Sequence, residues 1–80
     1  MDIRHLVTMA NQIAEFFKAS DPDRAEAVAA TAHHLHHFWD PRMRREIIAH
    51  LAVKDGEGLS EIALDAVRRL EAEASAKAAR

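Results

Sequence analysis

The fold of this chain is decided by the stretch His33-His34-Leu35-His36-His37-Phe38-Trp39-Asp40-Pro41-Arg42-Met43-Arg44-Arg45. Its Asp40-Pro41 step separates two helices, because the residue before a proline is forced out of the α region while proline suits the first helical turn. Asp40 is therefore predicted to be an N-cap, with the pair Phe38-Trp39 closing the preceding helix. Trp39, the only tryptophan, is either the largest core residue or an anchor for a partner.

Three arginines follow this break, where a helix ordinarily prefers acids. A cation at a helix N-terminus is disfavoured by roughly 0.3–1 kcal/mol. Arg42, Arg44 and Arg45 are thus expected to serve association with a partner rather than folding, where they would meet carboxylates or carbonyls. The alternative is that these arginines are simply solvated.

Length and composition indicate a small helical protein. The 80 residues make one domain, and a chain of this size buries only about 60% of its unfolded surface. There is no cysteine, and the net charge is −2 with both signs mixed along the chain, which argues against a general nucleic-acid binder. No apolar run approaches the roughly 18 residues of a membrane span. The N-terminus lacks the pattern of a signal peptide, so a cytoplasmic protein is expected.

Hydrophobic periodicity predicts an all-α fold, a small bundle or array of about four helices with short loops. Residues 1–70 are expected to form a single helical domain, and residues 71–80 an Ala-rich helical tail that frays. Helices are predicted over about 3–19, from Pro22 with Asp21 as N-cap, from Pro41 to about 53, and after Ser60 as N-cap. Gly56 is expected to end the third helix in the left-handed conformation.

The predicted apolar faces differ in width. The first helix has a wide stripe, which suggests contact with its own core on one side and with something else on the other, or else cover by two helices of the same domain. Its members are Ile3, Leu6, Val7, Met9, Ala10, Ile13, Ala14, Phe16 and Phe17. The other predicted faces are Ala25, Val28, Ala32, Leu35 and Trp39; Met43, Ile47, Ile48 and Leu51; and Ile62, Ala63, Ala66, Val67 and Leu70. Asp65–Arg69 and Glu73–Lys77 are expected to pair on the surface of the last helix.

Two other kinds of function are weighed from the residues. His33 and His37 stand one helical turn apart and could chelate Zn, Ni or Cu, but no carboxylate motif accompanies them to complete a site. A helix-turn-helix DNA-binding regulator is conceivable for the second and third helices, although the helix from Pro41 has few side chains for reading base edges. No catalytic motif is found: Ser20 and Ser60 are interpreted as caps, and there is no Gly-rich phosphate loop.

Three stretches together resemble a known family. They are Met9-Ala10-Asn11-Gln12-Ile13-Ala14-Glu15-Phe16-Phe17, the histidine-containing stretch into Phe38-Trp39-Asp40-Pro41-Arg42-Met43-Arg44, and Gly58-Leu59-Ser60 leading into Leu64 and Ala66-Val67. Over roughly residues 1–70 the chain is similar to the small delta subunit of cytosolic, NAD-dependent, molybdenum-containing formate dehydrogenase. The family pattern has fewer histidines in the central stretch and leaves the Ala-rich tail unexplained.

The resemblance implies an accessory subunit without an active site or cofactor of its own. It would bind the catalytic (alpha) subunit and assist assembly, cofactor insertion or stability, while molybdopterin, iron–sulfur clusters, FMN and NAD belong to the other subunits. No nucleic acid or membrane partner is expected, and self-association remains possible. The predicted partner-binding residues are Asn11, Phe38, Trp39, Asp40, Pro41, Arg42, Met43, Arg44 and Arg45.

Overall fold

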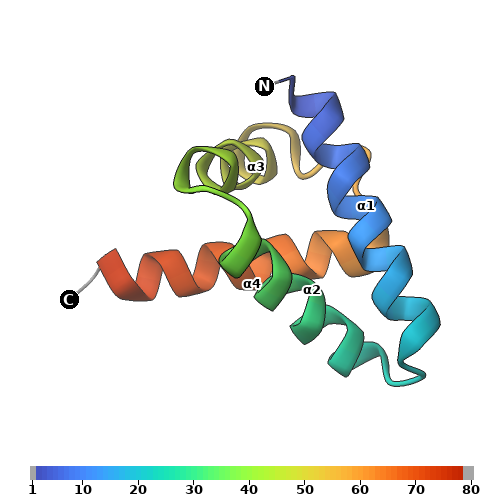
Figure 1. Ribbon diagram of the computed structural model, residues 1–80. Coiled ribbons are helices and arrows are strands. Elements are labelled where there is room, and N and C mark those ends of the chain that lie inside the picture. The colour runs from blue at the N-terminus through green and yellow to red at the C-terminus, as the bar shows by residue number, and fades with distance from the viewer. Residues whose placement is uncertain (1, 79–80) are drawn as a thin grey trace.

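Four helices make up the part of the chain that the structure, a computed structural model, describes, which is residues 2–78. They are α1 (Ile3–Ser20), α2 (Arg24–Phe38), α3 (Pro41–Lys54) and α4 (Glu61–Ala78). In Figure 1, α1 and α2 diverge from the turn that joins them, α4 runs across both, and α3 is seen nearly end-on near the start of α1. The described residues thus confirm the predicted all-α array of four helices with short loops. None of these helices is both long and apolar enough to cross a membrane.

Aspartate caps fix where three helices begin. The Asp2 side chain accepts a hydrogen bond from the Arg4 backbone N–H, and a further one from the Arg4 guanidinium, which lowers the pKa of the Asp2 carboxyl. Asp40 accepts from the Met43 backbone N–H at 2.9 Å and Pro41 occupies the first turn of α3. These two bonds satisfy N–H groups that no carbonyl inside the helix can reach. The predicted cap and start of α3 are confirmed.

The start of α2 differs from the prediction. Asp23, not Asp21, is its N-cap, and the helix begins at Arg24 instead of Pro22. The Asp21 side chain accepts from the Asp23 backbone N–H at 3.0 Å, which folds the turn and leaves Asp23 extended. Asp23 then accepts from the Ala25 N–H at 3.0 Å. Both aspartates suit a cap, and the local turn decides between them.

The core lies where α1, α2 and α4 meet, with one fully buried residue from α3. Small side chains let these helices approach closely, and the buried set is Leu6, Ala10, Ala14, Ala27, Leu35, Trp39, Ile47, Ile62, Ala63, Val67 and Leu70. The predicted face of α4 is confirmed. The predicted face of α2 is confirmed for Ala32, Leu35 and Trp39, but Ala25 is exposed, and Ala27 and Thr31, which were not predicted, are buried. The Thr31 hydroxyl donates to the Ala27 carbonyl at 2.7 Å, so its burial leaves no unpaired hydroxyl.

The loop between α3 and α4 is held against α1 by one side chain. The Asn11 amide nitrogen donates to the Gly58 carbonyl at 2.9 Å, and its oxygen accepts from the Ser60 backbone N–H at 2.8 Å. Ser60 in turn caps α4 through its hydroxyl, which accepts from the Ala63 N–H at 3.4 Å. Asn11 therefore stabilises the start of α4 from a helix far away in sequence.

Gly56 makes the turn out of α3 possible. It has the predicted left-handed conformation at φ 73°, and Asp55 before it shares it at φ 56°. The Gly56 N–H donates back to the His50 carbonyl at 3.3 Å, which closes the end of the helix. A Cβ atom at this position would lie 2.5 Å from the Leu64 side chain. Gly56 is thus required both by the backbone and by packing.

Surface ion pairs join α4 to α2 and also form within α4. Arg24 contacts Asp65 and Glu61, and the hydrogen bond that its guanidinium donates to Asp65 raises the pKa of Arg24. Asp65 also pairs with Arg68, so the predicted Asp65–Arg69 pair is wrong; Arg69 contacts Glu73 instead. The Lys77 side chain lies outside the described residues. The expected tail is helical to Ala78, and its fraying stays a prediction.

Replacing Asn11 by alanine should lower the free energy of unfolding by about 1–3 kcal/mol, because the loop carbonyl and N–H lose their partners. Urea unfolding followed by circular dichroism measures this loss. The control is Gln12→Ala, a change at the exposed neighbour that should be nearly neutral. Equal stability of the two variants would contradict the role given to Asn11.

Candidate protein-docking surface

The structure divides the residues of the α2–α3 corner into internal and external ones. Trp39 is only 4% exposed and belongs to the core, so the reading of Trp39 as a core residue is the one observed. Asp40 is the cap of α3, and Asn11 is occupied by the α3–α4 loop. Pro41 is exposed at the start of α3. The role of Trp39 in binding a partner stays a prediction.

Arg44 closes the end of α2. Its guanidinium donates to the His36 carbonyl at 2.6 Å and to the Trp39 carbonyl at 2.8 Å. The last carbonyls of a helix have no partner inside the helix and carry partial negative charge, so a cation there is favourable. Arg44 therefore lies in the first turn of α3, and its guanidinium caps the C-terminal end of α2. This corrects the expectation that all three arginines serve only association.

Arg42 and Arg45 lie on the surface, and so does Phe38, the residue before Trp39. Phe38 is 74% exposed, although the next side chain is buried. The difference follows from the corner itself, because adjacent residues at the end of a helix point about 100° apart. The side chains of the corner that are exposed to a partner thus include Phe38, Pro41, Arg42 and Arg45.

An apolar hollow of about 520 Å³ opens between α1, the end of α2 and the start of α3. We call it the aromatic groove, and it is lined by Met9, Gln12, Ile13, Phe16, Phe17, His34, Phe38, Trp39 and Met43. Phe16 is 64% exposed on one wall and Phe38 on the other. Exposed aromatic side chains that border a hollow are typical of protein interfaces.

Ring contacts connect the two walls of the groove. Phe16 meets Phe17 edge-on with ring centroids 5.2 Å apart, and Phe17 meets His34 at 6.0 Å. His34 in turn lies 4.7 Å from Phe38. These contacts hold the exposed rings in fixed positions, so a partner would meet a surface that is already ordered.

Sequence reasoning missed the α1 wall of the groove. The predicted partner-binding residues Phe38, Trp39 and Met43 are brought to the groove, but Met9, Ile13 and Phe16 of α1, and His34 of α2, were not predicted. The signal was the apolar stripe of α1, which is wider than a single core needs. That stripe does contact the core on one side, through Leu6, Ala10 and Ala14, and it exposes Phe16 on the other.

Two of the histidines outside the groove, His33 and His37, form a pair. The rings of His33 and His37 lie 4.1 Å apart, and His36 lies 5.3 Å from His37. Within residues 2–78, no group of three or more His, Asp or Glu side chains is arranged to hold a metal ion. A chelating pair without a third protein ligand would bind a transition metal weakly.

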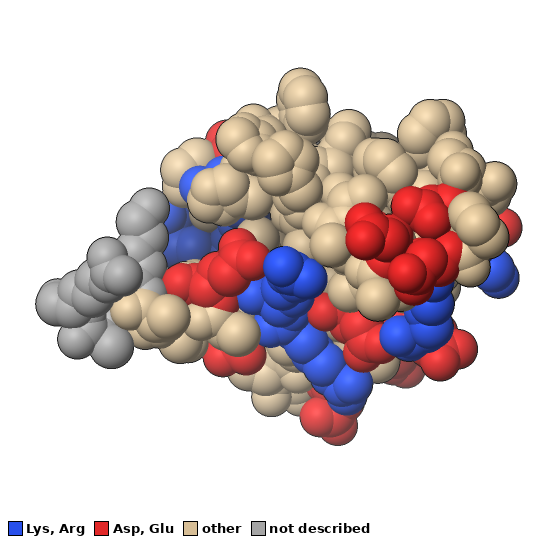
Figure 2. Space-filling model, turned by 90° about the horizontal axis from the view of Figure 1, so that it is seen from below, with Lys and Arg blue, Asp and Glu red and all other residues tan. Residues whose placement is uncertain are grey.

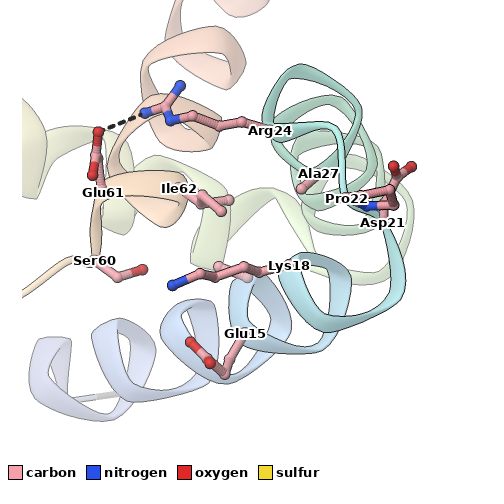
Figure 3. A pocket seen from close by; sticks show the side chains of 10 residues that line it. Glu15, Lys18, Asp21, Pro22, Arg24, Ala27, Ser60, Glu61 and Ile62 are labelled. Carbon is pink, nitrogen blue, oxygen red and sulfur yellow. Dashed lines mark hydrogen bonds and ion pairs between the residues drawn. The ribbon is translucent and has the colours of Figure 1, made fainter.

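A second hollow, of about 360 Å³, has several charged side chains in its lining and lies between α1, the α1–α2 turn and the start of α4 (Figure 3). Glu15, Lys18, Arg24 and Glu61 line it, and Arg24 pairs with Glu61 across it at 3.2 Å. On the face shown in Figure 2, basic and acidic side chains are interspersed. This pattern does not favour nucleic-acid binding, which gains from a continuous basic surface.

Replacing Arg44 by glutamine should lower the free energy of unfolding by about 1–3 kcal/mol, because two carbonyls at the end of α2 lose a charged donor. Arg45→Gln, one residue along and exposed, should leave stability almost unchanged. Thermal unfolding of both variants makes the comparison. If Arg44→Gln left the free energy of unfolding unchanged, Arg44 would instead be assigned to docking with a partner.

Comparison with known proteins identifies a family. The model of the family described as "NADH-dependant formate dehydrogenase delta subunit FdsD" matches residues 5–67. No curated protein and no solved structure matched the chain. The matched range covers α1, α2, α3 and most of the buried face of α4, and thus all three helices that line the aromatic groove.

Proposed function

The chain belongs to the family of delta subunits of NADH-dependent formate dehydrogenase, and we propose that it is a non-catalytic accessory subunit that binds the catalytic (alpha) subunit. The aromatic groove carries this proposal. Phe16 and Phe38 are 64% and 74% exposed on its two walls, and the ring contacts between them hold both in place. A partner that covers this groove would remove a large apolar area from water.

Assistance to the assembly or stability of the complex follows from such docking. An 80-residue chain has a modest core, and binding to its folded state adds stability by mass action. Binding stabilises the folded catalytic subunit in the same way, and the stabilised catalytic subunit can then receive its molybdenum cofactor. Cytoplasmic location is proposed as well, as the resemblance to a cytosolic enzyme implies.

The cofactors of the enzyme are assigned to the other subunits. This chain has no cysteine for an iron–sulfur cluster, and its described residues offer no cluster of three metal ligands. The contribution of this chain to the enzyme would therefore be to bind and stabilise the catalytic subunit. Molybdopterin, iron–sulfur clusters, FMN and NAD would stay with the partners.

Replacing Phe38 or Phe16 by serine should weaken binding to the purified catalytic subunit by about tenfold or more, as truncation of an aromatic anchor does. Neither change should unfold the protein, because both rings are mostly exposed. Val53→Ser is the matched control: Val53 is 75% exposed and does not line the groove. Binding measured by calorimetry that is unaffected by both Phe changes would rule the groove out.

Replacing His33 and His37 together by glutamine should leave formate oxidation by the assembled complex almost unchanged. The pair has no third ligand among the described residues, so any metal it holds would be weakly bound. Activity is compared with and without added Zn or Ni. Activity that is lost and then restored by metal would support a metal-binding module instead.

A further inference from the structure

We propose that a hollow between the end of α2, α3 and the second half of α4 receives an Asp or Glu side chain of the catalytic subunit, with an apolar side chain beside it. The hollow measures about 390 Å³, and we call it the arginine hollow because Arg44 and Arg45 line it. This inference rests on the proposed function. It adds to the aromatic groove a second contact with a different chemistry.

The lining of the arginine hollow combines positive charge with apolar surface. Beside Arg44 and Arg45, its apolar part is formed by Pro41, Ile48, Leu70 and Ala74. Apolar surroundings shield a carboxylate from water on one side, and this strengthens its hydrogen bonds to an arginine. The lining therefore suits a partner segment in which a carboxylate and an apolar side chain are neighbours.

Arg44 is held in place and still has donors for a ligand. Its hydrogen bonds to the His36 and Trp39 carbonyls are both donated from Nη1. An arginine has five N–H donors in a fixed planar arrangement, and within residues 2–78 those on Nε and Nη2 have no protein acceptor. These two nitrogens form the fork that binds both oxygens of a carboxylate. Because the backbone bonds already fix the guanidinium, less entropy is lost when a carboxylate binds.

The acids near the arginine hollow do not neutralise its positive charge. Glu73 is the only acid among the described residues that line it, and Glu73 contacts Arg69 at 3.4 Å within α4. Glu46, next to Arg45 in sequence, lines a different hollow beside α1. The ion pairs among the described residues include neither Arg44 nor Arg45. A carboxylate of a partner would supply this missing counter-charge.

The arginine hollow and the aromatic groove lie on opposite sides of the α2–α3 corner. On α3, Met43 lines the groove and Arg45 lines the hollow, and two residues along a helix point roughly 160° apart. At the end of α2, Phe38 lines the groove and His36 lines the hollow. A partner that covers the corner would contact both, and for this reason we assign the hollow to the catalytic subunit.

A protein carboxylate fits the arginine hollow better than the phosphates of a nucleic acid do. Four of its eight lining residues are apolar, whereas nucleic-acid binding gains from a continuous basic surface. The lining also contains Glu73, which would repel a chain of phosphates. A single carboxylate can bind Arg44 and Arg45 without approaching the other wall.

The first test measures binding to the purified catalytic subunit by calorimetry. Arg45→Glu should weaken binding at least about tenfold, because the partner carboxylate then meets a like charge. Arg42→Glu is the matched control: Arg42 is exposed on the same helix but lines neither the hollow nor the groove. Its effect should stay below about twofold at physiological salt. Equal effects of the two changes, or no effect of Arg45→Glu, would overturn the inference.

The second test fills the hollow without changing its charge. Ala74→Trp places a large ring in the lining and should weaken binding at least about tenfold by steric clash. The control is Ala72→Trp, on the same helix but outside the lining. Both alanines are exposed, so circular dichroism should show that both variants are folded. The inference is wrong if the two variants bind the catalytic subunit equally well.

The third test identifies the partner segment. The chain has no cysteine, so Ala74→Cys creates a single thiol that can be labelled with a photoreactive maleimide. Crosslinks located by mass spectrometry should reach a segment of the catalytic subunit in which Asp or Glu adjoins an apolar residue. Changing that acid to lysine should restore binding to the Arg45→Glu variant. Crosslinks to a segment without acids, or only to a second copy of this chain, would contradict the inference.

These outcomes separate the inference from the proposed function. If Phe38→Ser weakens binding of the catalytic subunit while Arg45→Glu and Ala74→Trp do not, docking in the aromatic groove stands and the arginine hollow is not a contact. If the wild type does not bind the catalytic subunit at all, the proposed function itself fails.

Discussion

The hydrogen bonds from Arg44 to the backbone of α2 are the interaction on which the corner of this protein depends. They tie the first turn of α3 to the last carbonyls of α2 at 2.6 and 2.8 Å, and so fix the direction in which the chain leaves Trp39. That direction places Trp39 in the core and Phe38 on the surface. The groove exists because the same corner sets Met43 opposite α1.

The sequence allowed the helices, the cap at Asp40 and the core face of α4 to be predicted, because proline, caps and the 3.6-residue period act locally. It predicted Asp21 as the cap of α2, where the structure has Asp23, since each satisfies the rules for a cap and only the local turn distinguishes them. Nor could it show what Arg44 contacts, because the His36 carbonyl is reached through the angle between two helices. A local turn determined the first, and the tertiary arrangement of two helices determined the second.

The docking surface was predictable only in part, because its α1 wall depends on how the helices pack. The stretch that contains Phe38, Arg42 and Arg45 stood out by its composition, and the resemblance to a delta subunit pointed to the family that residues 5–67 match. The α1 wall was visible only as a stripe of unusual width. Whether such a stripe covers a core or faces water depends on how many helices surround it. Here α2, α3 and α4 cover the part with Leu6, Ala10 and Ala14, and Phe16 stays outside.

The bonds from Asn11 to Gly58 and Ser60 also have a consequence for how the chain reaches its fold during synthesis. They join residues 47 and 49 positions apart in sequence, and α1 packs against both α2 and α4. The part of the α1 stripe that packs against α4 is therefore covered only after α4 has been synthesised. During that interval this part of α1 is open to premature contacts with other nascent chains, as expected of transiently exposed hydrophobic surface.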